Sequence, residues 1–334
     1  MAHLTPRSSV GSLGAMTPEA TLIALGDVLA AREVIGGRVH RTLVARSSYL
    51  GERAGVRLFL KLELFQKTGS FKPRGVLNKL HHLSAEDRRK GVVTLSAGNH
   101  AQALAWAATQ AGIRSTVVMP AMASRGKIDA ARGYGAEVVL TEGDLLAACL
   151  QIQRERNLTL VHPFDDPWII AGQGTVGLEI LEDVPDLDAL IVGVGGGGLI
   201  SGIATAAKGL KPALKLFGVE PEGASAMTRS LERGEPVRLE KVETIADGLA
   251  APFAGRLTYA HVRAHVDDML TVSDRQIAEA MGLILERCKL VAEPAAAASV
   301  AALLSGKLDL PKRATVVCVL SGGNVDRERL KSLL

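Results

Sequence analysis

The sequence predicts an α/β protein built on largely parallel sheets. Short runs of β-branched, apolar residues alternate with stretches of helical periodicity along most of the 334 residues. Two of these runs, at 92–95 and 190–194, end in small-residue turns that lead directly into helices. This strand, turn and helix order is typical of βα units.

The elements follow in order along the chain. A strand over 56–65 alternates, with Leu58, Leu60, Leu62 and Leu64 on one face, and a helix follows at 75–81. Further strands are predicted at 92–95, 115–119, 137–140, 190–194, 216–219 and 315–320. Helices are predicted at 99–110, 124–132, 145–156, 169–182, 199–208, 274–287 and 294–304. Ser273 and Gln276 form a capping box for the helix at 274.

Composition excludes several classes of protein. The length allows two or three domain-sized units, and the net charge of +4 comes from basic residues that are spread along the chain. Because aromatics are only 3%, the chain has no stacking platform, and we predict no nucleic-acid partner. No apolar run reaches membrane length, and the first sixteen residues lack a signal-peptide core. We expect a disordered tail at 1–16 and no membrane partner.

Three cysteines, Cys149, Cys288 and Cys318, stand in apolar segments. Their odd number and wide spacing are typical of buried free thiols in a reducing compartment. We therefore predict a cytoplasmic protein.

The segment from Ser70 to Gly75 contains the most informative residue, Lys72. It stands at the predicted start of a helix, with Pro73 suited to the first helical position. The helix dipole disfavours an ammonium there and lowers its pKa, as a lysine that forms an imine requires. Taken alone, Lys72 is better explained as a solvated surface lysine beside Lys67.

The glycine run from Gly193 to Gly198 follows a strand and precedes a helix. Its backbone N–H groups can converge on a phosphate, and the helix N-terminus adds a favourable field. The spacing also fits a dinucleotide-binding turn, with Glu220 placed as the ribose-binding acid, so an NAD-dependent dehydrogenase is an alternative. A tight turn without a ligand is a weaker explanation, because consecutive glycines cost backbone entropy.

Two further turns follow strands. In the first, from Ser96 to His100, the backbone amides and the side chains of Ser96 and Asn99 can hold a carboxylate or a phenolic oxygen. Taken alone, however, Asn99 is better explained as the cap of its helix and His100 as an ordinary helix residue. In the second, Ser321 begins a run with Gly322, Gly323 and Asn324, which could be only a glycine turn.

Together these four segments resemble one family, the fold type II pyridoxal-phosphate enzymes, and within it the threonine and serine dehydratases and the serine racemases. The resemblance spans residues 17–326 and includes 171–175, 245–248 and 293–295. By this likeness Lys72 binds pyridoxal 5'-phosphate covalently, Phe71 and Gly248 border its ring, Asn99 bonds its 3-hydroxyl, and Ser321 faces its pyridine nitrogen. The phosphate is assigned to Gly195, Gly196, Gly197 and Gly198. The substrate carboxylate is assigned to Ser96, Ala97, Gly98, Asn99 and His100.

The resemblance implies the tryptophan-synthase β-like fold, with two open, twisted, largely parallel-sheet domains. A small mobile domain at 90–163 is inserted into a large cofactor-binding domain made of 17–89 and 164–334, with no C-terminal regulatory domain. Closure of the small domain would exclude water from the reaction. A homo-oligomer, dimer or tetramer, is also expected.

The implied reaction is β-elimination from a hydroxyamino acid, which converts L-threonine to 2-oxobutyrate and ammonia and L-serine to pyruvate. Racemases carry a serine where this chain has Ala97, and Ala97 offers no proton to the second face of Cα. Phe164 also matches the dehydratases. The cation site of racemase-like members maps to Glu220 and Ala224, but a third ligand position is Ala226, so the metal stays unassigned. Serine racemase, 3-hydroxyaspartate dehydratase and a non-catalytic amino-acid-binding protein remain alternatives.

Overall fold

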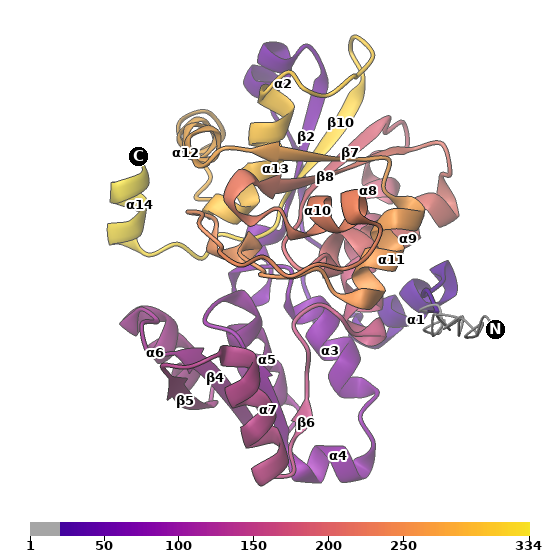
Figure 1. Ribbon diagram of the computed structural model, residues 1–334. Helices are drawn as coiled ribbons and strands as arrows, with labels where there is room; N and C mark the ends of the chain where they lie inside the picture. Colours follow the sequence, from indigo (N-terminus) through magenta and orange to yellow (C-terminus); the bar gives the residue numbers. More distant parts are fainter. Residues whose placement is uncertain (1–20) are drawn as a thin grey trace, which may run out of the picture.

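Two sheets organise the part of the chain that the computed structural model describes, residues 21–334 (Figure 1). The tail predicted at 1–16 lies outside these residues. In spatial order the six-stranded sheet contains β1 (Val44–Arg46), β2 (Arg57–Leu62), β10 (Thr315–Leu320), β7 (Ala189–Gly193), β8 (Lys215–Pro221) and β9 (Asp268–Val272). The four-stranded sheet contains β5 (Glu137–Thr141), β4 (Ser115–Pro120), β3 (Val92–Leu95) and β6 (Thr159–Leu160). All pairings are parallel except that of β1 with β2.

Helices connect the parallel strands, as parallel pairing requires. They are α1 (Leu25–Ile35), α2 (Ser48–Ala54), α3 (Pro73–His81), α4 (Ala85–Lys90), α5 (Asn99–Gln110), α6 (Arg125–Gly133), α7 (Leu145–Glu155), α8 (Pro167–Asp183), α9 (Gly198–Leu210), α10 (Ala226–Arg233), α11 (Arg256–His265), α12 (Asp274–Leu283), α13 (Pro294–Leu304) and α14 (Arg327–Leu333). Short 3-10 turns are η1 (Glu63–Phe65), η2 (Lys67–Gly69), η3 (Glu222–Ala224) and η4 (Asp247–Leu249), and η5 (Ile284–Cys288) is a π-helix.

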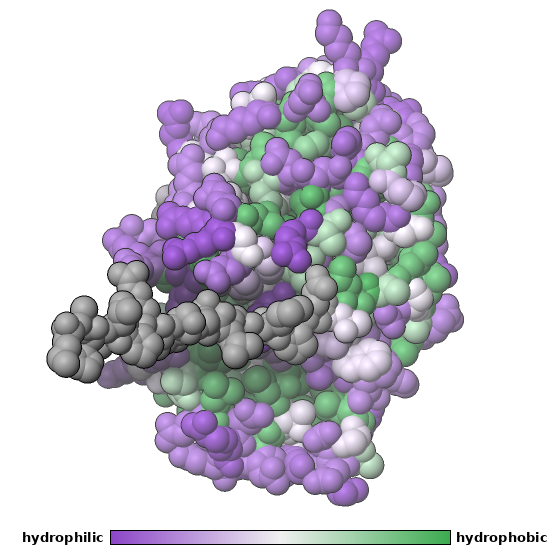
Figure 2. Space-filling view, turned by 45° about the vertical axis from the view of Figure 1, so that its right-hand side comes forward, coloured by the Kyte–Doolittle hydropathy of each residue, from purple (hydrophilic) through white to green (hydrophobic). Residues whose placement is uncertain are grey.

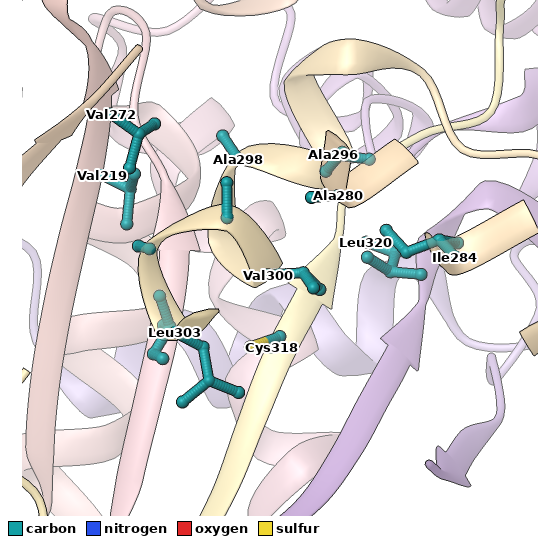
Figure 3. Packing of buried hydrophobic residues seen from close by; sticks show 14 of the residues in the cluster. Val219, Val272, Ala280, Ile284, Ala296, Ala298, Val300, Leu303, Cys318 and Leu320 are labelled. Carbon is teal, nitrogen blue, oxygen red and sulfur yellow. The ribbon is translucent and has the colours of Figure 1, made fainter. Parts of the chain in front are cut away.

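Helices cover both faces of the six-stranded sheet. On one face, side chains of α12 and α13 pack against the strands, and Val300, Leu303, Cys318 and Leu320 lie among them (Figure 3). Helices α8, α9 and α11 supply the opposite layer. Because helices cover both faces of this sheet, every residue of β10 is buried. Such strands are apolar along their whole length instead of alternating.

The four-stranded sheet is also covered on both faces. Cys149 of α7 packs against Val93 and Val118, while residues of α5 and α6 pack against Val117 and Met119. A separate cluster joins α3 to α5 beside this sheet. In Figure 1 the four-stranded sheet lies below the six-stranded one, with α3 near the level where they meet.

The predicted strands and helices are present, with ends that differ by a few residues. The capping box of Ser273 and Gln276 is confirmed. The helix predicted over 274–287 ends at Leu283 and continues as η5. Strands β1, β6 and β9 were not predicted, because they are short or interrupted by polar residues. Cys288 is only half-buried, which corrects the prediction of three buried thiols.

The surface of the described residues is mainly hydrophilic on the face shown in Figure 2, where apolar residues form separate patches. Within residues 21–334 no helix has both the length and the apolar character that crossing a bilayer requires. The division into domains at 90–163 stays a prediction, although the four-stranded sheet is made from that segment.

Candidate active site

A cavity of about 880 Å³ lies where the carboxyl ends of strands from both sheets meet. Parallel α/β sheets bind ligands at this end, because the loops there are free of strand pairing. All residues that were predicted to hold a cofactor or a substrate line this cavity. They are Phe71, Lys72, Ser96, Ala97, Gly98, Asn99, His100, Gly195, Gly196, Gly197, Gly198, Gly248 and Ser321. The fold thus brings together segments that are separated by up to about 250 residues in sequence.

Lys72 is the N-cap residue of α3, and Pro73 is the first helical residue, as predicted. Its Nζ donates a hydrogen bond to the Pro163 carbonyl at 2.8 Å and lies 5.1 Å from the centre of the Phe71 ring. Burial lowers the pKa of Lys72 from 10.5 to about 8, and the nearby Glu293 opposes this shift. We expected the helix N-terminus to lower this pKa, whereas removal from solvent is the main cause. The solvated alternative for Lys72 is wrong.

The glycine run forms the turn between β7 and α9. The N–H groups of Gly195, Gly196 and Gly197 make no hydrogen bond to the described residues. Gly197 has a φ of 91°, a left-handed conformation that suits glycine. A Cβ on Gly196 would collide with the ring of Phe164. The glycines therefore serve packing and at the same time leave donors open at the start of a helix, where an anion is favoured.

The second turn joins β3 to α5. Gly98, rather than Asn99, is the N-cap residue of α5, and no side chain caps this helix. The capping alternative for Asn99 is therefore wrong. The Gly98 N–H donates to Ser96 Oγ at 3.1 Å, whereas the N–H groups of Ala97, Asn99 and His100 have no partner among the described residues. These open donors can hold a carboxylate.

The His100 ring is buried beneath this turn. One ring nitrogen, Nε2, lies 3.2 Å from the Val161 carbonyl, and the other has no partner among the described residues. Burial, assisted by the charge of Lys72, lowers the pKa of His100 well below 6.5. The ring is therefore neutral, and His100 can contribute to anion binding only through its backbone.

The Asn99 side chain contacts two residues, Glu293 and Asn324, for which no role was predicted. Its Nδ2 donates to the two carboxylate oxygens of Glu293 at 2.8 and 3.1 Å. Its Oδ1 accepts from Asn324 Nδ2 at 2.8 Å. Glu293 and Asn324 were quoted only as parts of motifs, because contacts across about 200 residues leave no local pattern.

Ser321 follows β10 directly and is 5% exposed. Its carbonyl accepts from the Phe71 N–H at 3.1 Å, which joins the turn after β10 to the segment that carries Lys72. Its hydroxyl has no hydrogen-bond partner among the described residues. Ser321 thus presents an open hydroxyl at the cavity.

Gly248 lies on η4, and a Cβ there would meet the Ala295 side chain at 2.8 Å.

The metal candidates lie away from the cavity. Glu220 is fully buried, and its carboxylate accepts from the N–H groups of Met227 and Thr228 at 2.8 Å each. Burial raises the pKa of Glu220 to about 7. Ala224 is in η3, between Glu220 and α10. Within the described residues no group of three or more His, Cys, Asp or Glu side chains is placed to hold a metal, and the metal stays unassigned.

A group of four buried charges lies behind Lys72. We call it the Arg74 network, and it consists of Lys61, Glu63, Arg74 and Glu179. The Arg74 guanidinium contacts Glu63 at 2.8 Å and Glu179 at 2.7 Å, and Lys61 contacts Glu179 at 2.6 Å. Burial disfavours these charges, but the two carboxylates raise the pKa of Arg74 above its usual value. This network was not predicted from the sequence, because its members are up to 118 residues apart in the chain.

Comparison with known proteins decides the family. A family model described as pyridoxal-phosphate dependent enzyme matches residues 35–322. The chain belongs to this family. An L-threonine ammonia-lyase of Thermotoga maritima is 48% identical over 91% of this chain and 76% of its own length. The L-threonine dehydratase catabolic TdcB of Escherichia coli K12 is 43% identical over 93% of this chain and 96% of its own.

Solved structures agree with this family. The structure of maize serine racemase superposes with a TM-score of 0.89 at 38% identity and covers 93% of this chain and 97% of its own. The predicted fold type II architecture and the pyridoxal 5'-phosphate cofactor are therefore confirmed. The dehydrogenase alternative, which rested on the glycine turn and Glu220, is wrong.

The cavity fits this cofactor. A phosphate needs several N–H donors, and the turn before α9 leaves three without partners. An aldehyde needs an amine that loses its proton readily, and Lys72 is the lysine whose pKa burial lowers. A pyridine nitrogen needs a polar partner, and the Ser321 hydroxyl is open. These donors and acceptors match the groups of the cofactor in kind.

Proposed function

We propose that this chain is an ammonia-lyase that converts L-threonine to 2-oxobutyrate and ammonia, and L-serine to pyruvate and ammonia. The observation that carries the proposal is the Lys72 amine, partly buried in the cavity with its pKa lowered to about 8. Relatives named L-threonine ammonia-lyase and L-threonine dehydratase support the choice of substrate. The overall reaction is balanced, because the water lost with the β-hydroxyl is regained when the enamine product is hydrolysed.

Each of the predicted site residues has a proposed task. Lys72 attaches the cofactor and removes the Cα proton. The N–H groups of Gly195, Gly196, Gly197 and Gly198 hold its phosphate, Asn99 bonds its phenolic oxygen, Ser321 contacts its pyridine nitrogen, and Phe71 and Gly248 border its ring. The turn of Ser96, Ala97, Gly98, Asn99 and His100 binds the substrate carboxylate. When bound, the cofactor supplies the electron sink that stabilises charge on Cα.

The lowered pKa of Lys72 suits this residue to proton transfer. A pKa of about 8 leaves about a tenth of the free amine neutral at pH 7, against well under a thousandth at the ordinary value. The Pro163 carbonyl, 2.8 Å from Nζ, aims the amine into the cavity. Lys72 can therefore both receive and return a proton near neutral pH.

The absence of a hydroxyl at position 97 supports elimination over racemisation. Racemisation requires a second acid or base opposite Lys72, and the corresponding position is Ala97. The structural likeness to maize serine racemase nevertheless makes racemisation the second candidate. The two activities are separated by measuring D-serine and pyruvate in the same reaction.

The test of the proposal is a keto-acid assay on L-threonine, L-serine and 3-hydroxyaspartate, with chiral analysis of the remaining serine. We expect 2-oxobutyrate to form fastest. D-serine that accumulates faster than pyruvate would favour the racemase, and keto acid mainly from 3-hydroxyaspartate would replace threonine as the substrate. If the cofactor-loaded protein consumes no hydroxyamino acid, the non-catalytic alternative is favoured.

We also propose that residues 90–163 move as a unit to close the cavity. The ion pair between Lys127 of α6 and Asp247 of η4, at 2.7 Å, supports this, because it spans the rim between the two sheets. A homo-oligomer is proposed on family likeness alone, and sedimentation of the purified protein tests it. The cytoplasmic location stays a prediction.

A further inference from the structure

Glu293 is a buried carboxylate inside the cavity to which the proposed function gives no task. It is the N-cap residue of α13, it is 7% exposed, and it makes no ion pair among the described residues. Its backbone N–H donates to the Gly322 carbonyl at 3.1 Å, which joins α13 to the turn after β10. A carboxylate in such a place is costly unless its hydrogen bonds compensate it.

The hydrogen bonds of Glu293 go to Asn99. The Asn99 Nδ2 lies 2.8 and 3.1 Å from the two Glu293 oxygens, so one N–H serves both of them. On its other side, Asn99 Oδ1 accepts from Asn324 Nδ2 at 2.8 Å, and Asn324 Nδ2 also donates to the Thr68 carbonyl at 2.7 Å. The Asn99 amide is therefore held from both ends.

This arrangement permits only one orientation of the amide. An ionised carboxylate can only accept, whereas the NH₂ group of Asn324 can only donate. If the Asn99 amide turned over, its oxygen would face the Glu293 oxygens and its NH₂ would face the NH₂ of Asn324. In the observed orientation the second N–H of Asn99 has no partner among the described residues.

We propose that Glu293 is a positioning residue that orients the Asn99 amide so that its second N–H is presented to the phenolic oxygen of the cofactor. The inference rests on the proposed function, which places that oxygen at Asn99. Glu293 touches neither substrate nor cofactor in this role and acts through Asn99.

The charges around Glu293 make the orientation of the Asn99 amide sensitive to pH. Burial raises the pKa of Glu293 to about 7, with smaller opposing contributions from Asn99, Lys127 and Lys72 and a supporting one from Asp247. These groups belong to α5, α6, the N-cap of α3 and η4, while the turn after β10 contributes its backbone and the uncharged Asn324 amide, which contacts Asn99. Below pH 7 the protonated carboxyl can also donate, so the orientation of Asn99 is specified less firmly.

The experiment compares Glu293→Gln, Glu293→Asp and Glu293→Ala with Asn99→Ala in the cofactor-loaded enzyme. It measures the rate at which cofactor leaves on dialysis and the visible absorbance of bound cofactor between pH 5.5 and about 9. We expect Glu293→Ala to release cofactor about tenfold to a hundredfold faster, as expected for the loss of a charged hydrogen-bond partner, and Glu293→Asp to recover part of the loss. An absorbance transition near pH 7 in the parent should be absent from Glu293→Gln.

Glu220→Gln is the matched control, because Glu220 is also fully buried with its pKa raised to about 7 but lies outside the cavity. It should keep the parent's transition and release rate. If the Glu293 variants release cofactor like the parent while Asn99→Ala releases it faster, the inference is wrong and the proposed function stands. If Asn99→Ala also behaves like the parent, the placement of the cofactor oxygen at Asn99 fails. Should Glu293→Ala fail to fold, the missing transition in Glu293→Gln still decides.

Discussion

Lys72 and Arg74 are two residues apart at the start of α3, yet their charges meet opposite surroundings. Arg74 points into the Arg74 network, in which two cations face two carboxylates and every one of the four side chains forms an ion pair. Lys72 points into the cavity, where a neutral carbonyl is its hydrogen-bond partner. The pKa of Arg74 is raised, and that of Lys72 is lowered to about 8.

The difference shows how one short helix start serves both stability and reactivity. Burial disfavours both charges, but ion pairs compensate it at Arg74 and not at Lys72. The uncompensated charge is the one that becomes reactive. The compensated network holds α3 against β2 and α8 and so fixes the place from which Lys72 extends.

The largest expected effect comes from breaking the Arg74 network. Arg74→Met leaves the buried carboxylates of Glu63 and Glu179 facing one cation, Lys61. We expect the free energy of unfolding to fall by about 3–5 kcal/mol, as when one partner is removed from a buried ion pair. The midpoint of urea unfolding of the cofactor-free protein measures it.

The control is Arg156→Met, because Arg156 pairs with Glu137 at the surface, where the two side chains are 43% and 56% exposed. It should cost no more than about 1 kcal/mol. Equal effects of the two substitutions would show that the Arg74 network contributes no more than a surface pair.

The substitution Lys72→Met, two residues away, should instead raise the free energy of unfolding. A shift from 10.5 to about 8 corresponds to at most roughly 3 kcal/mol, and because Lys72 is only partly buried we expect a gain of about 1–2 kcal/mol below pH 8. Between pH 8 and 10.5 the unfolded chain binds more protons at Lys72 than the folded one, so the parent gains stability as pH rises. The advantage of Lys72→Met should therefore shrink across this window, while keto-acid formation is lost at every pH. A gain that does not change with pH would contradict the assignment of the cost to the charge.

The cavity and the Arg74 network show what the sequence can and cannot predict. Lys72, the glycine turn and the turn at Ser96 were singled out because each stands at the start of a predicted helix. The resemblance to a known family was needed to assign them to one site. The buried ion pair of Lys61 was not predicted, because strand alternation does not reveal that α8 covers the second face of β2. Its partner Glu179 is 118 residues away. Pairing at such distances depends on packing, which no local spacing encodes.

A further prediction concerns Ala97 in the wall of the cavity. Ala97 was singled out from the family resemblance, and the structure places it on the cavity wall. Ala97→Ser should raise the rate of serine racemisation by at least about tenfold, because a hydroxyl gives the second face of Cα a proton donor. Chiral analysis of serine measures it. Ala123→Ser is the control, since Ala123 also lines the cavity but on the loop before α6. If both variants racemise serine equally, the position of the hydroxyl is not what matters.

The smallest effect is expected at the rim, where Lys127 and Asp247 form an ion pair whose side chains are 31% and 67% exposed. Exposed pairs contribute about 0.2–1 kcal/mol, so Lys127→Ala should raise KM for threonine by about two- to fivefold and leave kcat unchanged. Arg125→Ala is the control, because Arg125 is on the same helix but 95% exposed and pairs only within it. Salt screens exposed charges, so the difference between parent and Lys127→Ala should vanish near 1 M salt. A KM that stays raised at high salt would mean that Lys127 contacts the substrate directly. Lys127 would then act as a substrate-binding residue of the cavity, and the ion pair with Asp247 would not be what closes the rim.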